Sequence, residues 1–88
     1  MYKLSPRFTL DDIGAQMYLR PRDPRTDSAV VLNDSSQFIV HLISQGITSL
    51  NDLATQFAGR YELSLAQATE DLTDFLTHMV LAGVIEKC

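Results

Sequence analysis

The chain has 88 residues, of which 45% are hydrophobic and 20% are charged. A chain of this length builds one hydrophobic core, which excludes a doubly wound dinucleotide-binding fold and a (β/α)₈ barrel. Seven Lys and Arg residues against eleven Asp and Glu residues give a net charge of −4, and this balance disfavours a partner that is held mainly through phosphate contacts.

Targeting and anchoring signals are not found in the sequence. The longest apolar run, residues 79–85, has seven residues, whereas a membrane-spanning helix needs about 20. No apolar segment of signal-peptide length follows Met1. The one cysteine, Cys88, rules out an internal disulfide framework. We therefore expect a single domain over residues 1–88 that is cytoplasmic and binds no membrane.

Two strands are predicted near the N-terminus. Residues 7–10 alternate polar with apolar side chains, and Asp11-Asp12 follows as a turn signal. Residues 15–20 also alternate, so that one face is apolar and the other polar, which predicts a half-buried strand. The apolar face consists of Ala15, Met17 and Leu19.

A loop and a third strand follow. Residues 20–27 contain two prolines, which cannot donate to a strand ladder, and they show no apolar periodicity. Residues 28–32 are rich in β-branched side chains, which favours a strand. Three short strands in succession, within about residues 6–33, favour an antiparallel meander.

Helix signals occupy about residues 34–83. For the first helix, Asp34 can act as the N-cap, and Gln37 stands at the capping-box position three residues later. Gly46 is a natural stop, because glycine adopts the left-handed conformation that ends many helices. The apolar stripe of this helix consists of Phe38, Ile39, Leu42 and Ile43.

Two further helices are predicted. Ser49 and Asp52 form the capping box of the second helix, and Gly59 is expected to end it. Ser64 opens the third helix, which is expected to span residues 65–82 and to stop at the next glycine. The inner stripe of the third helix consists of Leu65, Ala68, Leu72, Phe75, Leu76 and Met79.

These elements predict an α+β fold in which a three-stranded antiparallel sheet is followed by three helices. Residues 60–63 form a connection short enough to make the second and third helices neighbours. Strands beside three helices with such a turn have the outline of a winged helix-turn-helix.

No residue pattern points to catalysis. The sequence has no nucleophile-elbow motif and no glycine-rich phosphate loop. His41 and His78 fall on different predicted helices, so they form no close set of zinc ligands. A solvated helix face explains the acidic cluster of the third helix better than general acid–base chemistry, because so short a chain offers little shelter from water. That cluster consists of Glu70, Asp71 and Asp74. We expect a protein that is not an enzyme and holds no metal and no cofactor.

The charge pattern also disfavours nucleic acid. DNA-binding winged helices place a last helix with basic groups in the major groove. Residues 64–82 contain three acidic residues and no Lys or Arg, and residues 34–88 carry two basic and seven acidic residues, a net charge of −5. We expect no nucleic-acid partner, and a winged-helix transcription regulator is kept as an alternative.

Peptide binding suits the third predicted strand. Residues 29–32 contain neither Lys nor Pro, the residues with which proteins usually protect an exposed strand edge. An extended peptide could therefore pair with this strand, with the third predicted helix as the other wall of a groove. The candidate wall residues are Leu72, Phe75, Leu76, Met79 and Val80. The alternative is that all of these side chains belong to the core, in a generic protein-interaction domain.

Several short motifs occur along nearly the whole chain, from about residue 5 to residue 86. They are Leu32-Asn33, Gly46, Ser49-Leu50, Asp52-Leu53, Tyr61, Asp71-Leu72, Phe75-Leu76 and Gly83-Val84-Ile85. In this order and spacing they resemble the PqqD-like family, the small recognition domains in the biosynthesis of ribosomally made, post-translationally modified peptides (RiPPs). Residues 20–27 depart from the resemblance, since a shorter turn is expected there.

The resemblance implies a winged helix-turn-helix that acts as a peptide chaperone. Such a domain binds the leader segment of a precursor peptide as an added strand and presents the precursor to a modifying enzyme, such as a radical S-adenosylmethionine enzyme, or to a leader peptidase or cyclase. Carried over to this sequence, the peptide-binding residues are Ala29, Val30, Val31, Leu32, Asp71, Leu72, Phe75, Leu76 and Met79. The acidic helix face suggests a leader with Lys or Arg, and the unprotected strand leaves a homodimer possible.

Overall fold

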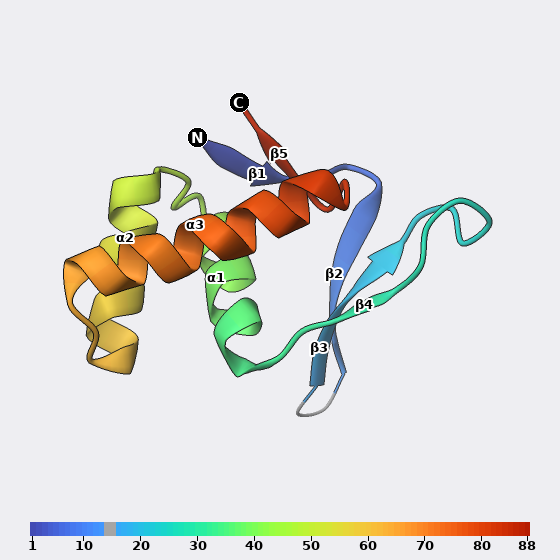
Figure 1. Ribbon diagram of the computed structural model, residues 1–88. Coiled ribbons are helices and arrows are strands. Elements are labelled where there is room, and N and C mark those ends of the chain that lie inside the picture. The colour runs from blue at the N-terminus through green and yellow to red at the C-terminus, as the bar shows by residue number, and fades with distance from the viewer. Residues whose placement is uncertain (14–15) are drawn as a thin grey trace.

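The computed structural model describes residues 1–13 and 16–88. Within them lie three helices and two antiparallel sheets, which confirms the predicted α+β class. Figure 1 shows the helices gathered at one end of the molecule and a sheet with a long loop reaching away at the other. The winged helix-turn-helix arrangement stays a prediction.

The larger sheet has the strand order β2-β3-β4, formed by β2 (Phe8–Ile13), β3 (Gln16–Pro21) and β4 (Val30–Val31). Both pairings are antiparallel, with Leu19 opposite Leu10 on one side and opposite Val30 on the other. The three strands occur in the predicted order, but their bounds differ from those predicted. Ala15, predicted on the apolar face of the second strand, lies outside the described residues.

Two details of this sheet differ from the predictions. Asp11-Asp12 is not a turn but part of β2, since Asp11 pairs with Tyr18 of β3 and accepts a hydrogen bond of 2.6 Å from Arg20 Nε. The third strand is confined to Val30–Val31 rather than residues 28–32. The strand gives way directly to α1, because Asn33 is the N-cap of that helix and the Leu32 carbonyl accepts a hydrogen bond from the side chain of Gln37.

A second sheet was not predicted at all. β1 (Tyr2–Leu4) pairs antiparallel with β5 (Ile85–Lys87), so that Tyr2 lies opposite Lys87. Because β5 follows the last helix, the predicted order of strands first and helices afterwards is wrong. Three-residue strands are too short to show a periodicity, and these two lie at opposite ends of the sequence.

The first helix, α1 (Asp34–Ser44), begins at Asp34, the residue that the sequence predicts as its N-cap. Its N-cap is Asn33 rather than Asp34, because Asn33 Oδ1 accepts the backbone N–H of Ser36 at 2.9 Å. The predicted stop is confirmed, since Gly46 has a φ of +91° directly beyond the helix.

The next two helices are α2 (Leu50–Tyr61) and α3 (Leu65–Leu81), and their predicted caps are confirmed. Ser49 Oγ accepts the N–H of Asp52 at 3.2 Å, and Ser64 Oγ accepts the N–H of Gln67 at 3.1 Å. Gly59 does not end α2. The helix runs past it to Glu62, which adopts the left-handed conformation with a φ of 54°.

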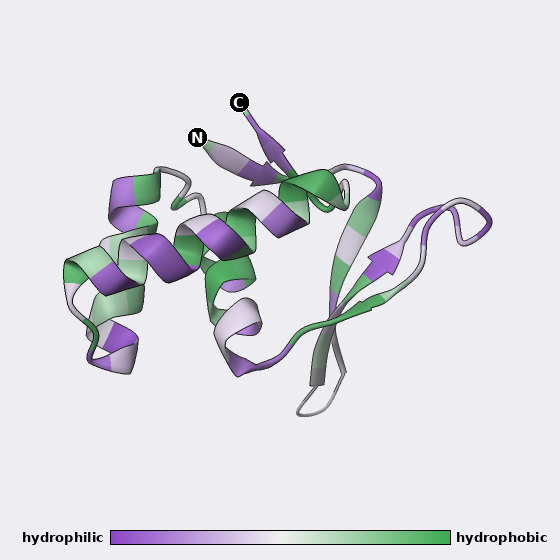
Figure 2. Ribbon diagram, in the orientation of Figure 1, coloured by the Kyte–Doolittle hydropathy of each residue, from purple (hydrophilic) through white to green (hydrophobic). Residues whose placement is uncertain are grey.

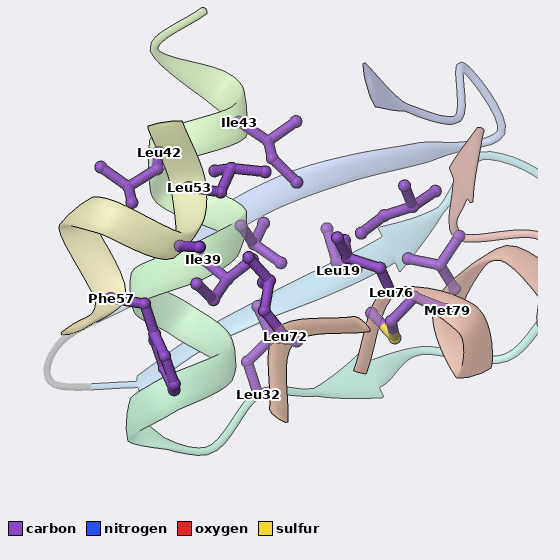
Figure 3. Close-up of a cluster of buried hydrophobic side chains, with 14 of the residues drawn as sticks. Leu19, Leu32, Ile39, Leu42, Ile43, Leu53, Phe57, Leu72, Leu76 and Met79 are labelled. Atoms are coloured by element: carbon purple, nitrogen blue, oxygen red, sulfur yellow. The ribbon is translucent and has the colours of Figure 1, made fainter. Parts of the chain in front are cut away.

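One hydrophobic core is shared by the helices and both sheets, and Figure 3 shows part of it, with Leu19 of β3 among side chains of the three helices. Figure 2 shows hydrophobic residues along α1 and β4, whereas the loop between β3 and β4 is mostly hydrophilic. Leu65 was predicted to lie on the inner stripe of α3, but it is 51% exposed because it stands at the first turn, beyond the core. The buried hydrophobic residues are Phe8, Leu19, Leu32, Ile39, Val40, Leu42, Ile43, Leu53, Ala54, Phe57, Ala68, Leu72, Leu76, Met79, Val84 and Ile85.

Candidate functional site

The strand β4 lies at one edge of the larger sheet, with β3 as its neighbour on one side. Val31 is 73% exposed, while Val30 is half-buried and packs against the core. This is the alternation expected of a strand with one face on the core and one face in water. Because β4 has only two residues, it offers one outward-facing side chain, that of Val31.

The backbone groups of Val31 point away from β3. Leu32 donates its N–H to the carbonyl of Met17 on β3 at 3.4 Å. Backbone groups of an antiparallel strand face its two neighbours alternately, so Leu32 and Val30 face β3 and Val31 faces the open edge. The edge of β4 therefore presents one N–H and one C=O next to an exposed valine.

The predicted site residues differ in how accessible they are. Four of them, Leu32, Leu72, Leu76 and Met79, are buried, with exposed fractions of 2%, 1%, 1% and 9%. They belong to one hydrophobic cluster, which joins the end of β4 to the inner face of α3. Figure 3 shows Leu32 and Leu72 close together in this cluster. Ala29, Val31 and Asp71 are exposed, and Val30 and Phe75 are half-buried.

The two flanks of α3 face different parts of the molecule. Leu76, Thr77 and Val80 line a hollow together with Tyr2 of β1 and Lys87 of β5. Helical spacing puts Phe75 and Asp71 on the opposite flank. Figure 1 shows β1 and β5 on one side of α3 and β4 on the other, so Phe75 and Asp71 belong to the flank on the β4 side.

The outer surface of α3 is acidic. Glu70, Asp71 and Asp74 are all exposed, and Asp71 Oδ1 accepts a hydrogen bond of 2.8 Å from the side chain of Gln67. His78 makes a hydrogen bond of 2.7 Å through Nδ1 with the backbone carbonyl of Asp74. Since these carboxylates stand in water, they offer long-range attraction for cations rather than a buried acid–base pair.

The loop before β4 is ordered by its own aspartates. The backbone carbonyl of Asp23 accepts the N–H groups of Thr26 and Asp27, and Asp27 forms an ion pair with Arg7, which directly precedes β2. A hollow beside the loop is lined by Arg20, Arg22 and Ala29 among others. The loop before β4, which is longer than the resemblance leads one to expect, thus places arginines next to the beginning of β4.

A group of aromatic residues between α1 and α2 was not predicted. The Phe38 and Tyr61 rings meet edge to face at 6.0 Å, and the Arg60 guanidinium stands 5.5 Å from the centre of the Phe38 ring. Burial raises the pKa of Tyr61, and the hydrogen bond of 2.6 Å from its hydroxyl to Asp34 raises it further. Helical spacing alone could not separate these residues from the core stripes of α1 and α2.

Metal ligands do not cluster in the part of the chain that the structure describes. Residues 1–13 and 16–88 contain no group of three or more His, Cys, Asp or Glu side chains that could hold an ion. In the same residues, none of the helices has the length and apolar character needed to cross a bilayer. The features that remain are the edge of β4 and the surfaces on the two flanks of α3.

Comparison with known protein families gives a match over most of the chain. Residues 22–85 match the family described as Coenzyme PQQ synthesis protein D (PqqD). No curated protein and no solved structure matches the chain. The matched segment includes the loop before β4, β4 itself and all three helices. With 64 of its 88 residues inside that match, the chain belongs to the PqqD family.

Proposed function

We propose that this member of the PqqD family, an accessory protein of PQQ or RiPP biosynthesis, binds the leader segment of a precursor peptide as an added strand on β4. The observation that carries the proposal is the open edge of β4, where Val31 is 73% exposed and its backbone groups face away from β3. Strand addition supplies affinity through main-chain hydrogen bonds and specificity through alternate side chains.

The peptide side chains would meet two different surfaces. On the inner side they would pack near Val30 and the flank of α3 that carries Phe75, both half-buried and both in contact with the core. Leu32, Leu72, Leu76 and Met79 act in this proposal by supporting that surface from beneath, because their side chains are buried. Ala29, Val30, Val31 and Phe75 would touch the peptide directly.

Charge would favour a particular leader. A peptide alongside β4 passes the arginine-lined hollow at one end and the exposed Asp71 on α3 toward the other. We propose that Asp71 and Asp74 favour a leader with Lys or Arg near the helix. Because all these groups are exposed, the preference would act mainly on the rate of association and would weaken in salt.

The domain itself would supply no chemistry. A bound leader holds the rest of the precursor near whichever modifying enzyme the domain also contacts, which raises the local concentration of substrate. The partner in this proposal is a modifying enzyme such as a radical S-adenosylmethionine enzyme. On binding, the disordered leader would lose conformational entropy, whereas the preformed sheet would change little.

The test uses a synthetic peptide that copies the N-terminal segment of a candidate precursor, chosen as a short open reading frame next to the genes for this chain and a modifying enzyme. In ¹H–¹⁵N correlation spectra of the full chain, we expect the peptide to shift the amides of residues 28–33 and 68–80. Val31→Pro removes the N–H that faces the open edge and leaves the ladder to β3 intact, so it should raise the Kd at least about ten-fold.

The matched control is Val31→Thr, which keeps both the β-branched shape and the N–H and should bind with nearly the same Kd. Equal binding by Val31→Pro and the unchanged chain would contradict strand addition on β4. Amide shifts confined to α2 would contradict the position of the site. Pairing of β4 with a second copy of the chain would appear as shifts that depend on protein concentration without any peptide.

A further inference from the structure

The side chain of Arg7 contacts two segments that border the site proposed on β4. Its Nε donates a hydrogen bond of 3.1 Å to Asp27 Oδ2, and its Nη2 donates to the other carboxylate oxygen. Asp27 lies in the loop before β4, three residues from Val30. One planar guanidinium thus holds both carboxylate oxygens, the arrangement in which an arginine–carboxylate pair is strong and specific in its geometry.

The Asp27 carboxylate is shielded from water, unlike the other paired aspartate of this loop. The Asp27 side chain is 9% exposed, whereas that of Asp23, which pairs with Arg25, is 45% exposed. Apart from Arg7, the Thr26 hydroxyl lies near the Asp27 carboxylate, at 3.5 Å. A shielded carboxylate that loses its cation is left poorly solvated. Asp27 is therefore expected to move, and the loop with it, when Arg7 is replaced.

The same guanidinium lies against the turn that follows α3. Gly83 has a φ of +77°, and a Cβ atom at this position would lie 2.8 Å from Arg7 Nη1. The backbone nearby is fixed as well, since Ser5 donates its N–H to the Val84 carbonyl at 2.9 Å and Ser5 Oγ accepts the Arg7 N–H at 3.2 Å. Figure 1 shows the connection between β1 and β2 beside the C-terminal end of α3. Arg7 therefore joins the end of α3 to the loop before β4.

The position of β4 depends on how its two ends are held, because its ladder to β3 spans only two residue pairs. At its C-terminal end, Leu32 is buried and lies close to Leu72 of α3 (Figure 3). At its N-terminal end, the chain continues into the loop in which Arg7 holds Asp27. Since Arg7 also contacts the turn after α3, the strand and the helix are connected to each other beyond both ends of β4.

We propose that Arg7 is a positioning residue of the β4 site. By holding Asp27 beside the turn after α3, it fixes the distance between β4 and the flank of α3 that carries Phe75. Arg7 would not touch the peptide. It would keep Val30 and Phe75 at the separation that a bound leader needs, so that the protein itself loses little conformational entropy on binding. This inference rests on the function proposed for β4.

The test measures the Kd of the leader peptide for variants of the full chain, with the same ¹H–¹⁵N titration. Arg7→Ala and Asp27→Asn should each raise the Kd at least about five-fold, because the site must then be ordered during binding. The double variant should raise the Kd no further than the single variants, since both remove the same contact. Arg25→Ala is the matched control, because it removes an arginine from the same region and breaks only the exposed pair with Asp23. Its Kd should stay within about two-fold of the unchanged chain.

A second measurement, on the chain without peptide, separates positioning from a general loss of stability. The N–H of Val30 faces β3, so its hydrogen exchange reports on the attachment of β4. In Arg7→Ala, the acceleration of exchange at Val30 should exceed the acceleration at Leu53 and Leu72 at least about five-fold. Equal acceleration at all three amides would show that Arg7 supports the whole fold, and would overturn the proposal.

The outcomes also separate this proposal from the function proposed for β4. Unchanged leader affinity in Arg7→Ala, with binding still weakened by Val31→Pro, would overturn the role of Arg7 and leave the β4 site in place. An equal loss of affinity in Arg25→Ala and Arg7→Ala would show that positive charge, rather than the contact with Asp27, supports binding, and would overturn it too. Failure of the unchanged chain to bind the leader at residues 28–33 would contradict both proposals.

Discussion

The helical part of the molecule and the larger sheet are built in different ways. Each helix begins at a side-chain cap, Asn33, Ser49 or Ser64, and contributes several fully buried residues to the core. The larger sheet contributes fewer buried side chains, and its β3–β4 pairing spans two residue pairs. Its surface carries exposed ion pairs, such as the one between Arg20 and Asp11.

The residues that stabilise the fold are thus largely different from those of the peptide site that we propose on β4. Buried apolar groups and satisfied caps give the helices a large share of the folding free energy, whereas exposed ion pairs contribute little. The edge of β4 is therefore free to vary or to bind without risk to the fold. Substitutions in the two parts should differ in size accordingly.

The largest difference is expected between Leu72→Ala and Val31→Ala. Leu72 is 1% exposed, so its truncation should leave a cavity and lower the free energy of unfolding by about 2–5 kcal/mol. Val31 is 73% exposed, and its truncation should change that free energy by less than about 0.5 kcal/mol. Urea unfolding of both variants measures the two values. Similar losses would show that β4 is part of the stabilising core.

A cap should matter less than the core but more than the loop. Ser64→Ala removes the acceptor for the Gln67 N–H and should cost about 1 kcal/mol of unfolding free energy. Ser28→Ala, in the exposed loop before β4, is the control and should be nearly neutral. Equal losses of unfolding free energy for Ser64→Ala and Ser28→Ala, measured by urea unfolding, would contradict a stabilising role of the Ser64 cap.

The ion pair on the larger sheet should be weaker still. Arg20→Ala breaks the contact with Asp11, in which the Arg20 side chain is 60% exposed, and should cost less than about 1 kcal/mol. The loss should shrink further in 1 M salt, where the Debye length falls to about 3 Å. A loss that does not depend on salt would indicate that packing of the arginine, rather than its charge, is what the sheet needs.

The smallest effect concerns pH and lies in the helical part. The pKa of Tyr61 is raised above its ordinary value of 10.0, first by burial and then by the hydrogen bond to Asp34. The protonated ring therefore stabilises the fold fully below about pH 10, and as the pH rises further the unfolded chain loses its proton first, so stability falls. Urea midpoints at pH 9 and pH 11 measure this fall, which should be shallower in Tyr61→Phe. An equal fall of the urea midpoint in the unchanged chain and in Tyr61→Phe would show that Tyr61 is not the source of this pH dependence.

Features encoded by neighbouring residues could be predicted from the sequence. The caps Ser49 and Ser64 each act on a backbone group three residues away, and both predictions are confirmed. The prediction that Gly59 ends α2 is wrong, because a glycine ends a helix only when the chain adopts the left-handed conformation there. In this chain Glu62 adopts it instead, with a φ of 54°.

Features that depend on distant residues could not be predicted in the same way. The β1–β5 pairing joins Tyr2 to Lys87, and no pattern among neighbouring residues predicts it. Helical spacing identified one apolar face of α3, but it could not tell a core residue such as Leu72 from a flanking residue such as Phe75. That distinction depends on what packs against the helix, and in the proposed site it would decide which residues a bound peptide touches.

The β1–β5 sheet has a consequence for how the chain folds. Bringing Tyr2 to Lys87 closes a loop of almost the entire chain, and the entropy of closing a loop grows with its length. Contacts at such sequence separation form slowly, so this sheet should assemble after the helices have collapsed. By the same reasoning it should open first under native conditions, and amide hydrogen exchange at Lys3 and Glu86 should be fast compared with exchange at Leu53.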